Sequence, residues 1–157
     1  MGASMDDIDL RLLELLQVDG RLTYNELGES VGLSISAVNE RLRKLNARGV
    51  IRSTVAVVDP AAVGLSLACF IQVLLERPEH DAPFIEGVRN LPEIQECHHI
   101  AGDYSYLLKV RTRDTTHLEK LITHGIKQLP GVIRSQTTIV LSTSKETTAL
   151  PISTEGP

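Results

Sequence analysis

The sequence has little aromatic character and no long apolar run. It contains no Trp, and its 157 residues include only three Tyr and two Phe. Proteins that bind single-stranded RNA stack the bases on aromatic side chains, so this composition argues against that class. No apolar stretch approaches the roughly 20 residues of a membrane span, and the N-terminus lacks the basic-then-apolar order of a signal peptide. We therefore expect a cytoplasmic protein with no membrane partner.

Cysteine and the common catalytic motifs are also scarce. Cys69 and Cys97 lie in apolar runs and form no CxxC pair, so neither a disulfide framework nor a zinc site is indicated. Both are expected to be buried, reduced thiols. The sequence holds no HExxH, Walker sequence, GxGxxG or GxSxG, each of which would place a metal, a phosphate or a nucleophile. We therefore expect no metal, no cofactor, no catalytic residues and no enzymatic activity.

The five histidines do not form a ligand set. His117 and His124 are seven residues apart on a predicted helix, which indicates a surface stripe. His98 and His99 are neighbours in a predicted strand, and side chains of neighbouring strand residues point to opposite faces. One of these two is therefore expected to be buried and hydrogen bonded, and the other exposed.

The net charge is −4, from 16 Lys and Arg against 20 Asp and Glu. This balance argues against a wholly basic surface but not against a local basic patch. Hydrophobic residues make up 42% and charged residues 23%, which is typical of a globular chain of one domain or two small ones. Apolar residues recur at helical spacing up to Arg48, and strand-like runs begin at Ile51. Residues 58–64 contain the Pro and Gly of a turn. The sequence therefore predicts an α+β protein of two units.

Three short helices are predicted in the first unit. Thr23 and Glu26 form a T-x-x-E capping box at the start of the second helix, and Gly32 ends it. Ser34 or Ser36 caps the third helix. Asp6 is placed to cap the first. The apolar residues of the first and third helices recur at helical spacing: Ile8, Leu12, Leu15 and Leu16, then Val38, Leu42 and Leu45.

The short turn between the second and third helices is typical of a helix-turn-helix. Residues 34–52 carry five cations and one acid, a net of +4, whereas residues 6–31 carry seven acids and two cations, a net of −5. A recognition helix meets base edges through its N-terminal residues and phosphates through its cations, and Asn39 can read adenine in bidentate fashion. A three-helix bundle that touches no nucleic acid is the alternative, with Arg43 and Lys44 on a solvated face. The predicted DNA contacts are Ser34, Ser36, Ala37, Asn39, Arg41, Arg43, Lys44 and Arg48.

The second unit alternates strand-like and helical runs. Strands are predicted near 65–76, 94–100, 104–112 and 132–141, with a helix after the first and another after the third. This β-α-β-β-α-β order is that of a ferredoxin-like domain. Val88, Leu91-Pro92 and Ile94 recur as Ile126, Leu129-Pro130 and Val132, 38 residues later. The first strand is apolar on both faces, so we expect helices to cover one face and a second copy of the chain to cover the other.

The turn from Gly102 to Tyr106 has the strongest features of a ligand site. Gly102 gives the backbone freedom, Asp103 offers a carboxylate that can accept from an ammonium group, and the tyrosines combine an apolar ring with a polar tip. The alternative is a purely structural hairpin turn, in which Asp103 bonds its own backbone.

These residues resemble the Lrp/AsnC, or feast/famine, transcriptional regulators of bacteria and archaea. The resemblance spans about residues 5–152 and rests on Asp9 in the leucine-rich first helix, on DGRLTYNELGESVGLSISAVNERLRKLNARGVI, and on LPEIQECHHIAGDYSYLLKV followed by LPGV. It implies a winged-type helix-turn-helix domain at 5–52, a hinge strand or linker at 53–64, and a ferredoxin-like ligand-binding and oligomerisation (RAM) domain at 65–152. It also implies a sequence-specific regulator that binds double-stranded promoter DNA as a homodimer assembling further, often to an octamer.

In this family an amino acid or related metabolite binds between dimers and shifts assembly or DNA binding. Ser105 stands where many members carry a second acid, and Ser142-Thr143-Ser144 replaces a stretch that is often acidic. The ligands of leucine- or asparagine-responsive members therefore do not carry over. The residues that match the effector cleft are Gly102, Asp103, Tyr104, Ser105, Thr115, Thr138 and Ile139.

Two other functions fit the same architecture. Siroheme decarboxylases are similar in layout, and His98, His99 and Arg111 are the candidates for a tetrapyrrole pocket. A stand-alone metabolite-binding module is the other alternative. The basic third helix argues against both, because neither function uses it.

Overall fold

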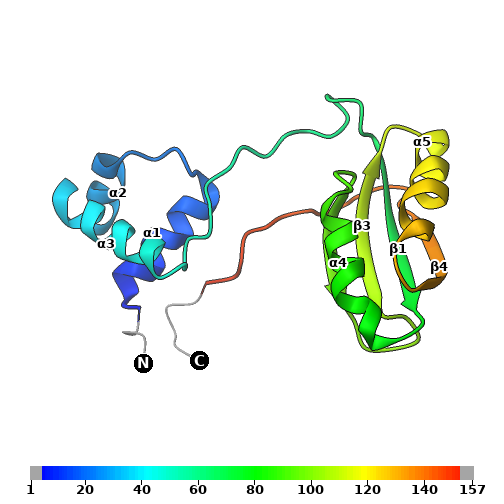
Figure 1. Cartoon of the computed structure of the whole chain (residues 1–157). Coiled ribbons are helices and arrows are strands. Elements are labelled where there is room, and N and C mark those ends of the chain that lie inside the picture. The colour runs from blue at the N-terminus through cyan, green and yellow to red at the C-terminus, as the bar shows by residue number, and fades with distance from the viewer. Residues whose placement is uncertain (1–4, 153–157) are drawn as a thin grey trace. The chain divides into compact units, whose positions relative to one another are not determined.

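The computed structural model describes residues 5–152, which divide into two compact units (Figure 1). The first unit contains the described residues up to Val57 together with the segment that begins at Lys145, and the second is Val58–Ser144. The sequence placed residues 145–152 in the second domain, but they pack with the helices. Gln17 Nε2 donates to the Leu150 carbonyl oxygen at 3.1 Å, and the Leu150 N–H donates to Gln17 Oε1 at 2.6 Å. The helical unit is therefore built from both ends of the described chain.

The three helices of the first unit begin and end close to the predicted residues. They are α1 (Asp7–Val18), α2 (Tyr24–Val31) and α3 (Ile35–Ala47). The side chains of Asp6, Thr23 and Ser34 each accept a hydrogen bond from a first-turn backbone N–H, which satisfies a donor that has no partner within the helix. Ser34, not Ser36, is thus the cap of α3. Gly32 ends α2 with a positive φ of 72°, as its position predicts.

The core of the helical unit joins all three helices. The buried side chains are Leu12 of α1, Leu27 of α2, and Val38, Leu42 and Leu45 of α3. Gly28 is buried beside the turn between α2 and α3, and its carbonyl accepts from the Leu33 N–H at 2.9 Å. A Cβ at residue 28 would lie 2.5 Å from the Leu33 carbonyl oxygen. The turn between α2 and α3 therefore depends on the missing side chain of this glycine.

The connection between the units was predicted to be a hinge strand or a linker. In the described chain, residues 53–59 belong to no strand, and residues 60–64 form a turn. A strand needs a second backbone to receive its N–H donors, and this segment pairs with none in the single chain. The described residues of the helical unit likewise contain no strand, so no β-wing accompanies its three helices. In this structure the connection is a linker.

The second unit has the predicted β-α-β-β-α-β order. Its strands are β1 (Leu67–Leu75), β2 (Ile94–His99), β3 (Tyr106–Thr112) and β4 (Val132–Ile139). They form one antiparallel sheet in the order β2-β3-β1-β4. The helices are α4 (Asp81–Arg89), after a short turn at Pro78–His80, and α5 (Thr115–Lys120), which continues through a π-helical turn at Leu121–Gly125 and a 3₁₀ turn at Ile126–Gln128.

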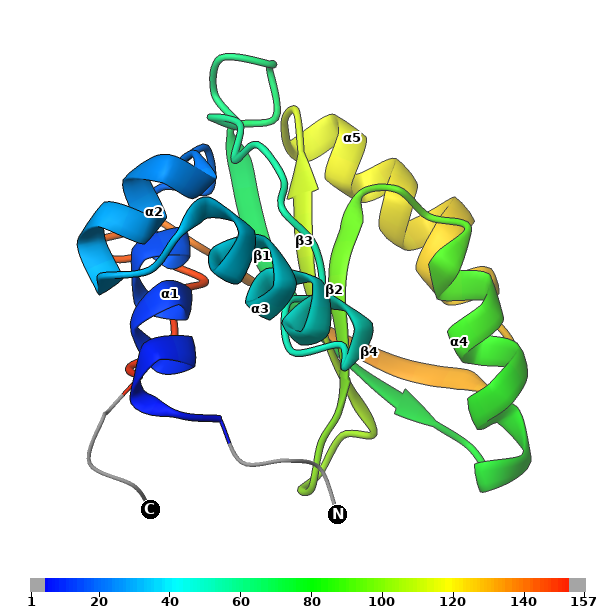
Figure 2. The same cartoon turned by 90° about the vertical axis from the view of Figure 1, so that its left-hand side faces the viewer.

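Helices α4 and α5 lie along the same side of the sheet (Figure 2). Their buried residues Phe84, Val88 and Leu118 pack in one cluster with Ile71 and Val73 of β1. Side chains alternate along a strand, so the intervening residues of β1 point to the opposite side. There Phe70 is 36% exposed. One face of the sheet thus holds the core, and the other has no cover from the described residues of its own unit.

Two expectations about β2 were wrong. Cys69 on β1 is buried, but Cys97 on β2 is only half-buried. Burial raises the pKa of the Cys69 thiol to about 11. His98 and His99 are both exposed, whereas one was expected inside, and the His99 ring stacks on Tyr106 with 4.9 Å between centroids. The reason is the position of β2 at the edge of the sheet, which a strand pattern alone does not reveal.

His117 and His124 were expected to form an exposed stripe on one helix. His124 is exposed, but His117 is half-buried and its Nε2 lies 3.1 Å from Glu93 Oε1.

Within residues 5–152 no cluster of three or more His, Cys, Asp or Glu side chains has the arrangement of a metal site. No helix in the described part of the chain is long and apolar enough to cross a membrane.

Candidate nucleic-acid interface and effector turn

Helix α3 presents a polar face because its apolar residues are drawn inward. Val38, Leu42 and Leu45 are buried in the core, whereas Ser36, Asn39 and Arg43 are exposed. At the start of the helix, Ala37 N–H donates to Ser34 Oγ at 3.2 Å, and the Ser34 and Ser36 hydroxyls are 3.1 Å apart. The N-terminal half of α3 therefore offers short polar side chains, the kind that lets a helix approach base edges closely.

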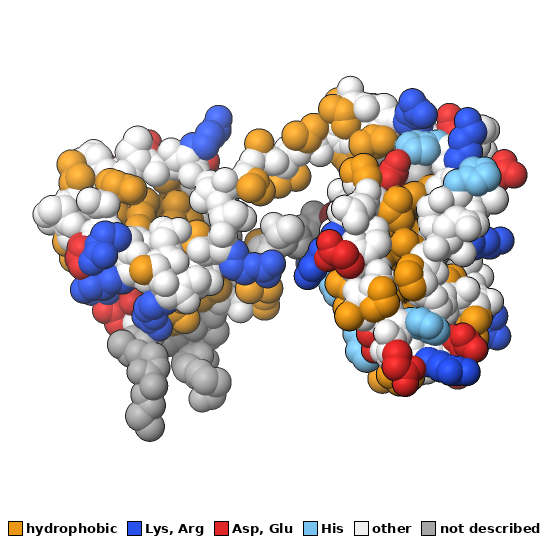
Figure 3. Space-filling view, in the orientation of Figure 1, with side chains coloured by type: hydrophobic (Ala, Val, Ile, Leu, Met, Phe, Trp, Pro, Cys, Tyr) orange, Lys and Arg blue, Asp and Glu red, His pale blue; other side chains and the backbone are white. Residues whose placement is uncertain are grey.

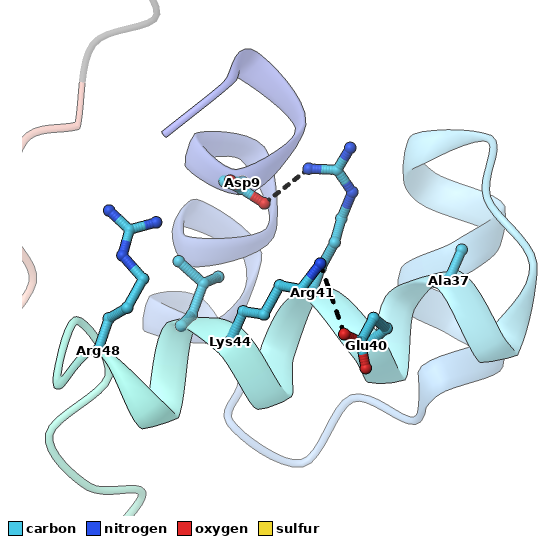
Figure 4. Close-up of a pocket in the computed structure, with 7 residues that line it drawn as sticks. Asp9, Ala37, Glu40, Arg41, Lys44 and Arg48 are labelled. Carbon is cyan, nitrogen blue, oxygen red and sulfur yellow. Dashed lines mark hydrogen bonds and ion pairs between the residues drawn. The ribbon is translucent and has the colours of Figure 1, made fainter. Parts of the chain in front are cut away.

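The cations in the middle of α3 share one acidic partner. Arg43 donates from Nε and Nη2 to the two carboxylate oxygens of Glu40, at 2.9 and 2.8 Å. Lys44 Nζ lies 3.4 Å from Glu40 Oε1 (Figure 4). The hydrogen bonds from Arg43 lower the pKa of Glu40 to about 2, so the carboxylate is ionised at neutral pH. On the face of the helical unit in view, Figure 3 shows basic and acidic side chains side by side.

Arg41 bonds acids at the start of α1 and not Glu40. Its Nη1 donates to Asp6 Oδ2 at 2.7 Å and to Asp9 Oδ1 at 2.8 Å, and Figure 4 shows it turned toward Asp9. The Arg41 side chain is 29% exposed and that of Asp9 only 14%. The backbone N–H of Asp9 and the Arg41 guanidinium together lower the pKa of Asp6. Arg41 was expected to bind phosphate, but here it ties α3 to the first turn of α1.

A hollow of about 380 Å³ runs along the side of α3 that faces α1 (Figure 4). Its lining includes Lys44 and Arg48, which follow Arg41 at spacings of three and seven residues and so lie on the same side of the helix. Asp9 and Glu40 were not expected as neighbours of these cations. For Glu40 the signal was present in the sequence, because acids three and four residues before a cation pair with it on a helix. The residues around the hollow are Asp9, Ala37, Glu40, Arg41, Lys44, Leu45 and Arg48.

The turn between β2 and β3 is fastened to the sheet by Ser105. The Ser105 N–H donates to the Val73 carbonyl oxygen at 2.9 Å, and Ser105 Oγ accepts from the Leu75 N–H at 3.1 Å. Gly102 has a φ of 139°, which few other residues adopt. Asp103 is exposed. Ser105 therefore positions the turn, and the carboxylate of Asp103 is accessible.

Tyr104 extends from this turn across to β4. Its hydroxyl donates to Gln136 Oε1 at 2.9 Å, and the Arg134 guanidinium lies 4.8 Å from the ring centroid. A cation over an aromatic ring is attracted to the negative face of the π system. Neither Arg134 nor Gln136 was predicted, because the pairing that brings β4 beside β1 cannot be deduced from local sequence. Tyr104 thus links the turn to β4.

The remaining predicted effector residues lie at different distances from this turn. Thr138 pairs with Phe70 and Ile139 with Cys69, whereas Ser105 bonds Val73 and Leu75. Thr138 is the nearest of them, because it is two residues from Gln136, the partner of Tyr104. Thr115 begins α5, just beyond the far end of β3, so the length of that strand, about 20 Å at roughly 3.3 Å per residue, separates Thr115 from the turn.

Comparison with known proteins identifies both units. Residues 5–52 match the model of a winged helix-turn-helix DNA-binding domain, and residues 68–150 match that of the Lrp/AsnC ligand binding domain. The chain belongs to the Lrp/AsnC family. This Lrp/AsnC chain is a DNA-binding transcriptional regulator of the predicted α+β fold, and both the resemblance and the fold class are confirmed.

Relatives of the Lrp/AsnC chain cover almost its whole length. It is 37% identical to the transcriptional regulator FL11 of Pyrococcus horikoshii over 152 residues, which are 97% of this chain and 99% of FL11. It is 38% identical to the leucine-responsive regulatory protein of Escherichia coli K12 over 155 residues, 98% and 94% of the two chains. A transcriptional regulator from Neisseria meningitidis, crystallised with L-Met, superimposes with a TM-score of 0.90 at 34% identity, over 94% and 97% of the chains.

Proposed function

We propose that this regulator binds promoter DNA through the exposed face of α3, and that an amino acid or related metabolite bound between dimers modulates the binding. The observation that supports the DNA interface is the orientation of α3. Burial of Val38, Leu42 and Leu45 turns the capped N-terminal half and the cations outward. Arg41 is set apart from the contact set because it already bonds Asp6 and Asp9. The proposed contacts are Ser34, Ser36, Ala37, Asn39, Arg43, Lys44 and Arg48.

Arg43→Ala and Lys44→Ala should each reduce the salt dependence of DNA binding. A cation that neutralises one phosphate contributes about 0.9 to the slope of log K against log salt concentration, so we expect each slope to fall by about 1. The measurement is fluorescence anisotropy of a mixed-sequence duplex at several salt concentrations. Arg11→Ala on α1 is the matched control, since Arg11 is likewise paired with an acid three residues away. Unchanged slopes in both α3 variants would contradict the phosphate contacts.

The effector proposal is supported by the ligand-binding domain match and by the exposed carboxylate of Asp103. The structure of the Neisseria relative with L-Met points to an amino acid as the ligand class. Because Thr115 and the turn at Gly102 lie at opposite ends of β3 in one chain, we propose that different copies contribute them to one site. The uncovered sheet face would pair two copies into a homodimer, and dimers would associate further, to an octamer.

Calorimetry of the protein against each of the twenty amino acids tests the effector site. We expect saturable heat with at least one of them, and loss of that heat in Asp103→Asn, because the amide no longer offers an ammonium group a negative charge. Glu119→Gln, an exposed acid on α5, serves as the control and should bind normally. Absence of heat with every amino acid at millimolar concentration would refute the effector proposal. Light scattering with and without the bound ligand would give the number of copies.

We propose no enzymatic activity for this chain. The two histidines available for a tetrapyrrole pocket, His98 and His99, are exposed on an edge strand. Relatives that match over nearly the full length are named as transcriptional regulators. These observations favour the regulator over the enzyme and over the stand-alone metabolite module.

A further inference from the structure

Glu40 is the one acid among the 19 residues from Ser34 to Arg52, which carry five cations. The apolar stripe of α3 points into the core, and helical spacing places Glu40 on the opposite side. Ser36, Arg43 and Ala47 share its stripe, at spacings of four, three and seven residues. The Glu40 side chain is 48% exposed. A carboxylate therefore stands near the centre of the face that the proposed function directs into the major groove.

An acid in this position works against DNA affinity. It repels the phosphates, and it competes with them for donors of Arg43 and Lys44. The bidentate contact with Arg43 also fixes the direction of the carboxylate, because two parallel N–H···O bonds restrict its rotation. Glu40 is thus both charged and oriented. Phosphate attraction gives no reason for such a group, whereas base recognition does.

We propose that Glu40 is a specificity-determining residue that accepts a hydrogen bond from the N4 amino group of cytosine in the major groove. The proposal rests on the DNA-binding function proposed above. Cytosine presents a donor at this edge, and carboxylates are suited to accept from it. Guanine and thymine present acceptors at O6 and O4, and adenine presents the N7 acceptor beside its N6 donor, so each of these bases carries an acceptor that repels an ionised carboxylate. Glu40 therefore favours cytosine, and discrimination by repulsion is common where specificity matters more than affinity.

Selection of binding sites from a pool of randomised duplexes tests this assignment with the full-length protein. The wild type should enrich cytosine at one position of its site. Glu40→Gln should move the preference at that position to adenine, because a glutamine amide can pair with adenine N6 and N7 in bidentate fashion. Glu40→Ala should lose the preference, by about tenfold in discrimination. Glu14→Gln is the matched control, since Glu14 pairs with Arg11 at the same helical spacing on α1, and it should leave the selected site unchanged.

A second measurement does not depend on the selected sequence. On a fixed mixed-sequence duplex, Glu40→Gln should bind several-fold more tightly with a steeper salt slope, because Arg43 and Lys44 are released toward phosphate. If both Glu40 variants select the same site as the wild type, Glu40 is only a partner of the two cations and the inference is overturned. If the wild type enriches no sequence at all, the proposed sequence-specific function fails, and the inference fails with it.

Discussion

Gly28→Ala should destabilise the helical unit by about 2 kcal/mol and weaken DNA binding, while the stability of the sheet unit stays unchanged. The added Cβ would lie 2.5 Å from the Leu33 carbonyl oxygen, which is backbone and cannot rotate away. Alanine is favoured over glycine inside a helix by about 1 kcal/mol, but overpacking of a tight contact costs about 3 kcal/mol. The clash therefore outweighs the gain in helix propensity. It also forces α2 and α3 apart, and so moves the face proposed to bind DNA.

Gly32→Ala provides the control for this variant. Gly32 has a positive φ of 72°, and a Cβ at this residue would meet no atom within 4 Å, so only backbone strain opposes the substitution. We expect a loss of about 1 kcal/mol there, without loss of DNA binding. Hydrogen exchange resolved by segment is the measurement, because it reports on the two units separately. Equal exchange rates in α2 and α3 of Gly28→Ala and wild type would show that the turn tolerates a side chain.

Arg41→Ala should destabilise the helical unit by about 2 kcal/mol, since it leaves the nearly buried carboxylate of Asp9 without its cation. Its DNA salt slope should be unchanged, in contrast to that of Arg43→Ala. In the double variant Arg41→Ala/Asp9→Ala, part of the lost stability should return, because no buried charge remains unpaired. A salt slope reduced as much as in Arg43→Ala would instead show that Arg41 leaves α1 and contacts phosphate.

The pH dependence of stability supplies a second readout for Arg41. The pKa of Asp6 is lowered from its ordinary 3.8 in the folded protein, by the Asp9 N–H and then by Arg41. A carboxyl with a depressed folded pKa contributes stability that is complete above its unfolded value and is lost as the pH falls through the folded value. Removal of Arg41 raises that folded pKa toward 3.8. The contribution of Asp6 should therefore become smaller, and its loss should be complete at a higher pH.

The features predicted correctly from sequence are those set by neighbouring residues. The T-x-x-E box predicts where α2 begins, and a glycine predicts where it ends. Apolar residues three and four positions apart predict the buried stripe of α3. The order of strands and helices in the second unit also follows from local periodicity. The recurrence, 38 residues later, of the pattern Val88, Leu91-Pro92 and Ile94 supports it. Each of these signals lies within one or two helical turns, or within one strand, so the rest of the fold does not alter it.

The features that sequence did not reveal depend on distant parts of the chain. Arg41 looks like any other cation of a basic helix until α1 places Asp6 and Asp9 beside it. His98 and His99 point to opposite faces, since His99 pairs with the buried Tyr106, but both remain exposed because β2 lies at the edge of the sheet. The predicted effector residues were grouped by the family resemblance, whereas the length of β3 separates Thr115 from the turn at Gly102. In each case the deciding contact joins residues far apart in sequence.

The contact between α1 and the segment that begins at Lys145 affects the order in which the helical unit is synthesised and folded. Gln17 leaves the ribosome early, but its partner Leu150 follows 133 residues later. The whole sheet unit, Val58–Ser144, is synthesised between them. Domains generally fold as units during synthesis, beginning from the N-terminus. Here the helices that carry the proposed DNA interface are made first, yet their unit is completed last, after the ligand-binding domain has already emerged.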